Sequence, residues 1–92
     1  MRRERDIEAY LVTKVRKAGG VAYKFVSPGR AGVPDRLCVC PGGAVCFVEL
    51  KAPGCEPTAI QYAQISRLQR LGCRVHIIYD KEQVDPLVGM YR

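Results

Sequence analysis

Apolar residues recur every three or four positions in two stretches of this chain, which is the spacing of one helix face. The first stretch runs from Glu4 to Ala18 and the second from Thr58 to Leu71, and glycine follows each of them. A shorter run, Lys81 to Val88, follows Asp80, a residue type that favours the N-cap position. The pattern therefore predicts three helices.

Strand-forming residues fill four other runs. Val21 to Val26 has the sequence Val-Ala-Tyr-Lys-Phe-Val, which predicts the first strand, and Arg74 to Tyr79 predicts a short strand. Arg36 to Cys40 and Ala44 to Leu50 are rich in strand-formers and flank Pro41-Gly42-Gly43, a turn signal. The two middle runs are therefore expected to form a β-hairpin.

The expected helices and strands follow one another in the order α-β-β-β-α-β-α. No repeat or linker interrupts them, which predicts one α/β domain over residues 1–92. The connection through the second helix is long enough to be a parallel, right-handed crossover. Both faces of the hairpin are mostly apolar, so we expect helices to cover both sides of the sheet. The expected fold is a mixed four-stranded sheet flanked by helices.

The hairpin turn decides which side chains meet at the end of the sheet. If the three turn residues form the loop, Cys40 faces Ala44, and counting outward places Asp35 opposite Glu49, with Cβ atoms roughly 4.5–5.5 Å apart. Lys51, two residues beyond Glu49, shares that face. A two-residue Gly-Gly loop would shift the register by one and separate the two acids.

Two carboxylates this close repel each other unless a cation lies between them. Mg²⁺ or Mn²⁺ suits oxygen ligands, and a bound metal ion polarises a phosphate and lowers the pKa of an attacking water. Asp35, Glu49 and Lys51 therefore have the arrangement of a metal-dependent site that cleaves phosphodiesters. The alternative is a loop-capping aspartate and a strand-end glutamate paired with the lysine.

Composition narrows the class of protein. The chain has 92 residues, a net charge of +6 and a pI near 9.3, which favours a polyanionic partner. It lacks a long apolar run and a signal-peptide core, so an intracellular, cytoplasmic protein is expected. Its five cysteines and one histidine include no Cys-x-x-Cys pair, so reduced core thiols are favoured over a zinc site.

The ordered set of motifs resembles the VRR-NUC branch of the PD-(D/E)xK nucleases. Gly32-Val33-Pro34-Asp35-Arg36, Phe47-Val48-Glu49-Leu50-Lys51-Ala52 and Gln61 follow that branch's pattern, with Glu4 in the first helix. The resemblance implies a restriction-endonuclease-like core and Mg²⁺- or Mn²⁺-dependent cleavage of branched DNA. Stand-alone members, found in phages and bacteria, resemble homodimeric Holliday-junction-resolving nucleases. A two-fold pair of sites also suits symmetric cutting of a junction.

The resemblance also suggests roles for individual residues. Asp35, Glu49 and the backbone carbonyl of Leu50 would be metal ligands, with Glu4 as a further candidate. Lys51 would hold the attacking water or stabilise charge on the phosphate.

Two of these assignments have alternatives. Glu8 lies within reach of the same helix face as Glu4, and either acid would also be favoured by the helix dipole. Gln61 would lie beside the metal, but Thr58-x-x-Gln61 is also a capping box, in which Gln61 bonds the backbone of Thr58.

Three basic residues near the glycine-rich loop, Lys24, Arg30 and Arg36, are candidate phosphate contacts, with solvated surface as the alternative. The expected protein is thus a metal-dependent, structure-selective DNA endonuclease, and specifically a homodimeric Holliday junction resolvase. A nuclease for flaps or other branched DNA, a non-catalytic basic DNA-binding subunit and an RNA-cleaving toxin are the alternatives.

Overall fold

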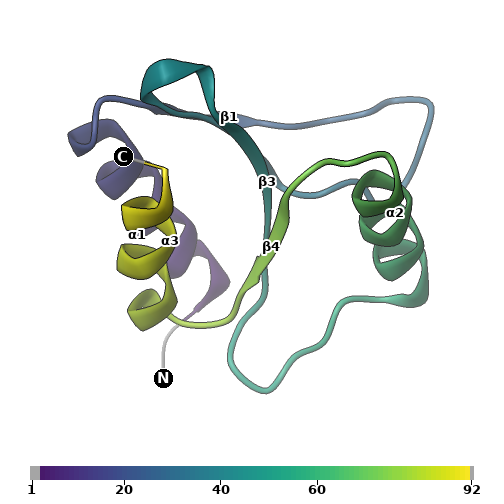
Figure 1. Ribbon diagram of the computed structural model, residues 1–92. Coiled ribbons are helices and arrows are strands. Elements are labelled where there is room, and N and C mark those ends of the chain that lie inside the picture. The colour runs from purple at the N-terminus through teal and green to yellow at the C-terminus, as the bar shows by residue number, and fades with distance from the viewer. Residues whose placement is uncertain (1–2, 92) are drawn as a thin grey trace.

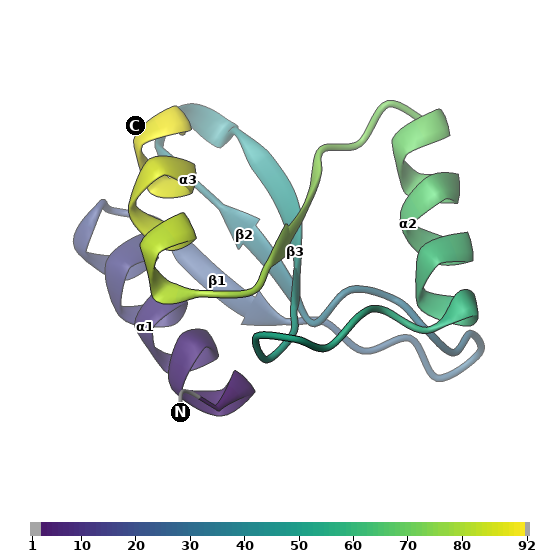
Figure 2. The same ribbon diagram turned by 90° about the horizontal axis from the view of Figure 1, so that it is seen from below.

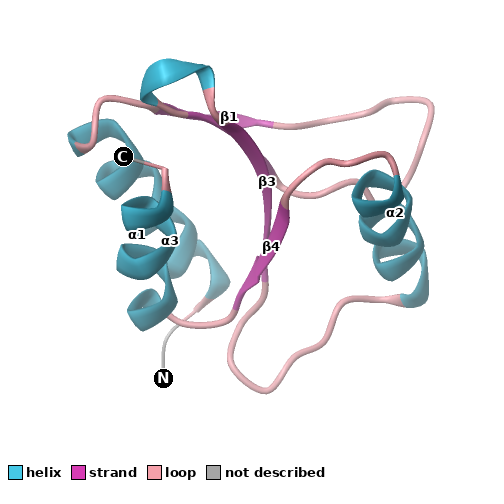
Figure 3. Ribbon diagram, viewed as in Figure 1, coloured by secondary structure: helices cyan, strands magenta, loops and turns pink. Residues whose placement is uncertain are grey.

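A four-stranded mixed sheet with helices on both sides forms the protein, in a computed structural model that describes residues 3–91 (Figures 1 and 3). The strands lie in the order β1-β2-β3-β4; the first three are antiparallel and β4 is parallel to β3. No helix within residues 3–91 is long and apolar enough to cross a membrane. The elements are α1 (Glu4–Lys17), β1 (Val21–Lys24), β2 (Arg36–Val39), β3 (Val45–Leu50), α2 (Ala59–Arg70), β4 (Val75–Ile78) and α3 (Val84–Met90).

The element order agrees with the pattern of apolar positions, and the boundaries differ by one or two residues. The exception is the last helix, predicted over Lys81 to Val88. Asp80 is an N-cap as predicted, but it caps a single 3-10 turn, Lys81–Gln83, and α3 begins after it and ends at Met90. The side chain of Asp80 accepts from the backbone of Glu82, which closes this tight turn.

The hydrophobic core lies between the sheet and the two helices α1 and α3, which pack on the same side (Figure 1). Ile7 and Leu11 of α1 are fully buried there, and Val84 of α3 joins them. The sheet contributes every second residue of β3, as strand alternation requires. These β3 residues are Cys46, Val48 and Leu50.

The opposite face of the sheet is covered less completely than the core face. Helix α2 stands on this side (Figure 2), joined to β3 by residues 51–58 and to β4 by residues 71–74, and Ile65 is its one buried residue. Val45 remains 43% exposed, and Ile60 and Leu71 of α2 are exposed as well. Helices thus flank both faces of the sheet, as predicted, although α2 buries a single side chain.

The hairpin turn takes the predicted three-residue form. Pro41–Gly43 is a 3-10 turn, in which Gly42 and Gly43 have positive φ angles of 82° and 85°. Cys40 donates its backbone N–H to the carbonyl of Ala44 at 2.7 Å, directly across the turn. The register that follows from this turn is the one predicted.

Candidate active site at the end of the sheet

Strand pairing brings Asp35 and Glu49 together. In the β2–β3 ladder Arg36 faces Val48, so one further step places Asp35 opposite Glu49. The backbone of Asp35 bonds away from β3, because its carbonyl accepts from Phe25 at 2.9 Å. Asp35 and Glu49 therefore form a non-hydrogen-bonded pair, the closer of the two kinds, with Cα atoms about 4.5 Å apart.

Glu49 is a buried carboxylate with little to stabilise its charge. Its side chain is 1% exposed, and within the described chain neither of its carboxylate oxygens accepts a hydrogen bond. Nζ of Lys51 lies 3.4 Å from Oε2. Burial, and then the charge of Asp35, raise the pKa of Glu49 to about 7, against the effect of Lys51. Such a carboxylate is poised to bind a cation.

Asp35 is held by the backbone of β3. Its Oδ2 accepts the N–H of Leu50 at 2.9 Å, which leaves Oδ1 available to another partner. In a strand the N–H and C=O of one residue point to the same side, so the carbonyl of Leu50 also faces Asp35. The backbone bond to Asp35 was not anticipated from the sequence, although the register of the turn contains the signal for it.

The structure distinguishes the two glutamates of α1. Glu8 pairs with Arg36 at 2.9 Å and lies 3.7 Å from Lys24. Glu4 is exposed overall, but partial burial of its carboxyl and then the charge of Asp35 raise its pKa, while Lys51 lowers it. Glu4 is thus electrostatically coupled to Asp35 and Lys51, whereas Glu8 belongs to an ion-pair group beside them.

Gln61 takes part in the capping box that the sequence offered as its alternative role. The backbone N–H of Thr58 donates to Oε1 of Gln61 at 2.8 Å, and the N–H of Gln61 donates to the hydroxyl of Thr58 at 3.2 Å. The side chain is half-buried in the first turn of α2. In this structure the side-chain oxygen of Gln61 therefore accepts a hydrogen bond that caps the N-terminus of α2.

The three candidate phosphate contacts differ in their freedom. Arg30 is exposed, and the side chain of Lys24 is 62% exposed despite its contact with Glu8. Arg36 is only 19% exposed and donates to Glu8 and to the carbonyl of Ala22. Its guanidinium thus has partners inside the protein, which local sequence pattern does not reveal, because Glu8 is 28 residues away.

Within residues 3–91, no group of three His, Cys, Asp or Glu side chains is arranged to hold a metal ion. The donors at the sheet end are instead two carboxylates, Asp35 and Glu49, and the carbonyl of Leu50. All are oxygens, as Mg²⁺ and Mn²⁺ prefer. The two unbonded, buried oxygens of Glu49 are the observation that fits a divalent cation here.

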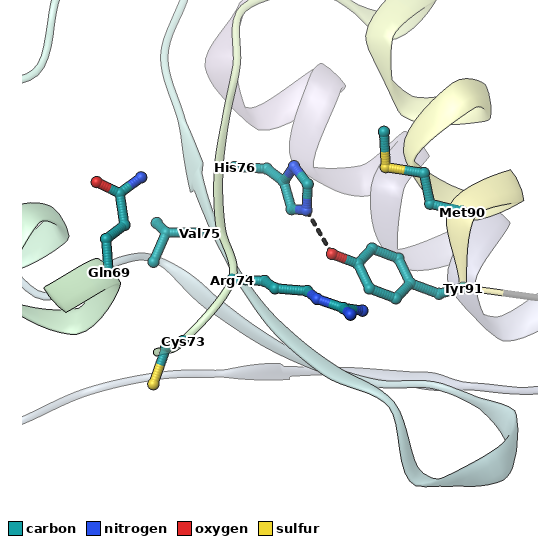
Figure 4. A pocket seen from close by; sticks show the side chains of 7 residues that line it. All are labelled: Gln69, Cys73, Arg74, Val75, His76, Met90 and Tyr91. Carbon is teal, nitrogen blue, oxygen red and sulfur yellow. Dashed lines mark hydrogen bonds between the residues drawn. The ribbon is translucent and has the colours of Figure 1, made fainter. Parts of the chain in front are cut away.

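A hollow of about 470 Å³ lies elsewhere, beside the start of β4. His76 points across it to the hydroxyl of Tyr91, 2.6 Å away, and Arg74 stacks over the same ring (Figure 4). The register places this end of β4 beside Phe47, whereas Glu49 and Leu50 pair with the other end. None of the candidate site residues lines the hollow.

Known proteins resemble this chain over nearly its whole length. No protein-family model matches it. It is 52% identical over 86 residues to "Putative nuclease p44" of Acyrthosiphon pisum secondary endosymbiont phage 1. The matched residues span 94% of this chain and 91% of the relative. A solved structure described as a VRR_NUC domain superposes with a TM-score of 0.86 at 28% identity, covering 97% of both chains. The predicted fold is thereby confirmed, and the chain belongs to the VRR-NUC family.

Proposed function

We propose that this protein is a Mg²⁺- or Mn²⁺-dependent DNA endonuclease that resolves Holliday junctions as a homodimer. One observation carries the proposal. The register sets Asp35 beside Glu49, whose buried carboxylate oxygens lack hydrogen-bond donors, with Lys51 3.4 Å away. A relative named as a nuclease over nearly the same length supports the reaction class.

In this proposal, Asp35, Glu49 and the Leu50 carbonyl hold the metal ion, with Glu4 and Gln61 as further site residues. When bound, the ion supplies Lewis-acid polarisation of the scissile phosphate. Lys51 offers a compact ammonium, 16% exposed, that orients water or neutralises phosphate charge. Water adds to phosphorus, the bond to one sugar oxygen breaks with its electron pair, and that oxygen takes up the proton that water loses.

Two features support a DNA substrate and a dimer. The net charge of +6 and the exposed side chains of Lys24 and Arg30 provide phosphate contacts. On the face of the sheet towards α2, the register aligns Val21, Val39 and Val45 in one row, and the two outer valines are 47% and 43% exposed. We propose this valine row as part of the dimer contact, since one protomer carries one site.

The test is cleavage of a labelled four-way junction beside flap, duplex and single-stranded DNA and an RNA stem, with Mg²⁺, Mn²⁺ or EDTA. Asp35→Asn and Lys51→Ala should retain the fold and DNA binding and lose cleavage. Glu82→Gln and Lys81→Ala, which likewise neutralise one carboxylate and remove one lysine, in the turn before α3, are the controls.

Symmetric, metal-dependent cuts in the junction, lost in both site variants and kept in both controls, are the expected result. Cleavage mainly of flaps would retain the nuclease and remove the resolvase. Binding without cleavage by the unaltered protein would favour a non-catalytic DNA-binding subunit, and cleavage of RNA alone would favour the RNA-cleaving class.

A further inference from the structure

Backbone hydrogen bonding between β2 and β3 follows a two-residue repeat that can be counted from the turn. Cys40 and Ala44 form a bonded pair. The register continues through Cys38 with Cys46 and Arg36 with Val48, and alternate pairs in such a ladder exchange backbone bonds. The observed pairing ends at Arg36–Val48; counting in steps of two from Cys40, the next bonded pair would join residue 34 to residue 50.

Residue 34 is a proline, so this pair lacks the ladder bond that the N–H of residue 34 would donate. Proline has no N–H to donate to the carbonyl of Leu50. The N–H of Leu50 donates instead to the side chain of Asp35, at 2.9 Å. The carbonyl of Leu50 points to the same side as its N–H, so it faces Asp35 without the donor that the ladder would supply.

Proline is unusual at this place in a sheet. β2 lies between β1 and β3, and a proline beside a central strand is tolerated mainly at the strand start. Pro34 occupies that position, directly before Asp35, and its side chain is fully buried. The ring is therefore fixed where it ends the backbone pairing.

We infer that Pro34 is a positioning residue: by removing one backbone donor it keeps the Leu50 carbonyl, together with Asp35, available to a divalent cation. This inference rests on the proposed function. An alanine here restores an N–H that competes with the cation for the carbonyl. We expect Mn²⁺ affinity to fall about fivefold to tenfold, where tenfold corresponds to about 1.4 kcal/mol.

Two comparisons separate the missing N–H from the loss of the ring. A synthetic chain with N-methylalanine at position 34 lacks both the ring and the N–H, and it should bind Mn²⁺ like the unaltered protein. Pro57→Ala removes the same atoms from another buried proline, which precedes the N-cap of α2, and it should also leave Mn²⁺ binding unchanged.

The experiment measures Mn²⁺ binding to the full chain without DNA, by calorimetry or by the resonance of free Mn²⁺. In Pro34→Ala, hydrogen exchange of the new amide is followed with and without Mn²⁺. Weaker binding, together with an amide that is protected in the metal-free protein and exposed when Mn²⁺ is added, supports the inference.

Equal Mn²⁺ affinity of Pro34→Ala and the unaltered protein, or an unprotected amide at position 34, would overturn it. Equally weak binding of the alanine and N-methylalanine chains would also overturn it, since the ring would then be responsible. Absence of Mn²⁺ binding by the unaltered protein would instead remove the metal from the proposed function. If Mn²⁺ binding changes in the variants as expected but the unaltered protein cleaves no DNA, the nuclease is rejected and the role of Pro34 in metal binding is kept.

Discussion

Arg36 donates from Nε to a carboxylate oxygen of Glu8 at 2.9 Å and from Nη1 to the carbonyl of Ala22 at 3.0 Å. These bonds join α1 to β1 and β2 one residue after Asp35. Glu4 lies one helical turn before Glu8, on the same side of α1. The pair thus fixes the helix that carries Glu4 against the end of the sheet where the candidate site lies.

Removing Arg36 should destabilise the protein more than it weakens DNA binding. Arg36→Ala leaves Glu8 without its closest partner at a half-buried position, and the expected loss of unfolding free energy is about 1–2 kcal/mol. Urea unfolding measures it, with Arg70→Ala on the exposed surface of α2 as the control. An unchanged unfolding midpoint would show that the Glu8 contact contributes nothing.

Lys24 and Arg30 should contribute to the salt dependence of DNA binding. Each phosphate contact that is lost lowers the slope of log K against log salt concentration by about 0.9 on duplex DNA. Lys24→Ala and Arg30→Ala should each show this reduction on a junction without metal, with Lys81→Ala as the control. Slopes equal to that of the unaltered protein would remove both residues from the DNA contact.

Glu49→Gln should stabilise the metal-free protein at pH 8 while it abolishes metal binding. Glu49 is almost fully buried, its oxygens lack hydrogen bonds, and its pKa is raised by burial and by Asp35. Removing that charge should raise the unfolding free energy by about 1–3 kcal/mol in EDTA. A loss of stability in the variant would mean that the ion pair with Lys51 outweighs the cost of burial.

His76 should make the protein sensitive to acid. Burial, and then the charge of Arg74, lower the pKa of His76 below its ordinary value of 6.5, so the folded state binds its proton less readily than the unfolded state. The stability present above pH 6.5 is therefore lost as pH falls below that value. Between pH 6.5 and 5.5 the melting temperature should fall more steeply in the unaltered protein than in His76→Gln. Parallel curves would contradict the assignment.

Val45→Lys should weaken the proposed dimer. It places a charge in the valine row, and we expect the dimer dissociation constant to rise at least about tenfold, or about 1.4 kcal/mol. Sedimentation equilibrium measures this, and Met90→Lys, at an exposed position on α3, is the control. A monomeric unaltered protein, or equal effects of both variants, would reject the valine row as the contact.

The elements and the pairing of Asp35 with Glu49 were predictable because they depend on local signals. Strand alternation and the three-residue turn at Pro41 are sufficient to set the register. The capping box of Gln61 was equally visible, since it spans three residues. Such features need no knowledge of how distant segments pack.

The rest depends on contacts between segments that are far apart in sequence. Nothing near Arg36 indicates that its partner is Glu8 on α1. The apolar pattern of α2 predicted a helix with one apolar face, but only Ile65 of that helix is buried, because burial depends on how the helix packs against distant segments. The packing of distant segments thus determines the burial of α2 and the partner of Arg36, which local sequence propensity does not specify.

The alternation of β3 separates two kinds of constraint on a single strand. Cys46, Val48 and Leu50 belong to the core, whereas Val45, Phe47 and Glu49 point to the α2 face, where the candidate site and the valine row lie. If the proposed function holds, mutations at the odd positions would therefore change chemistry and assembly, while the even positions are restricted by packing volume. A lineage of this fold can thus diverge in substrate or partner through every second residue of one strand and still inherit an unaltered interior.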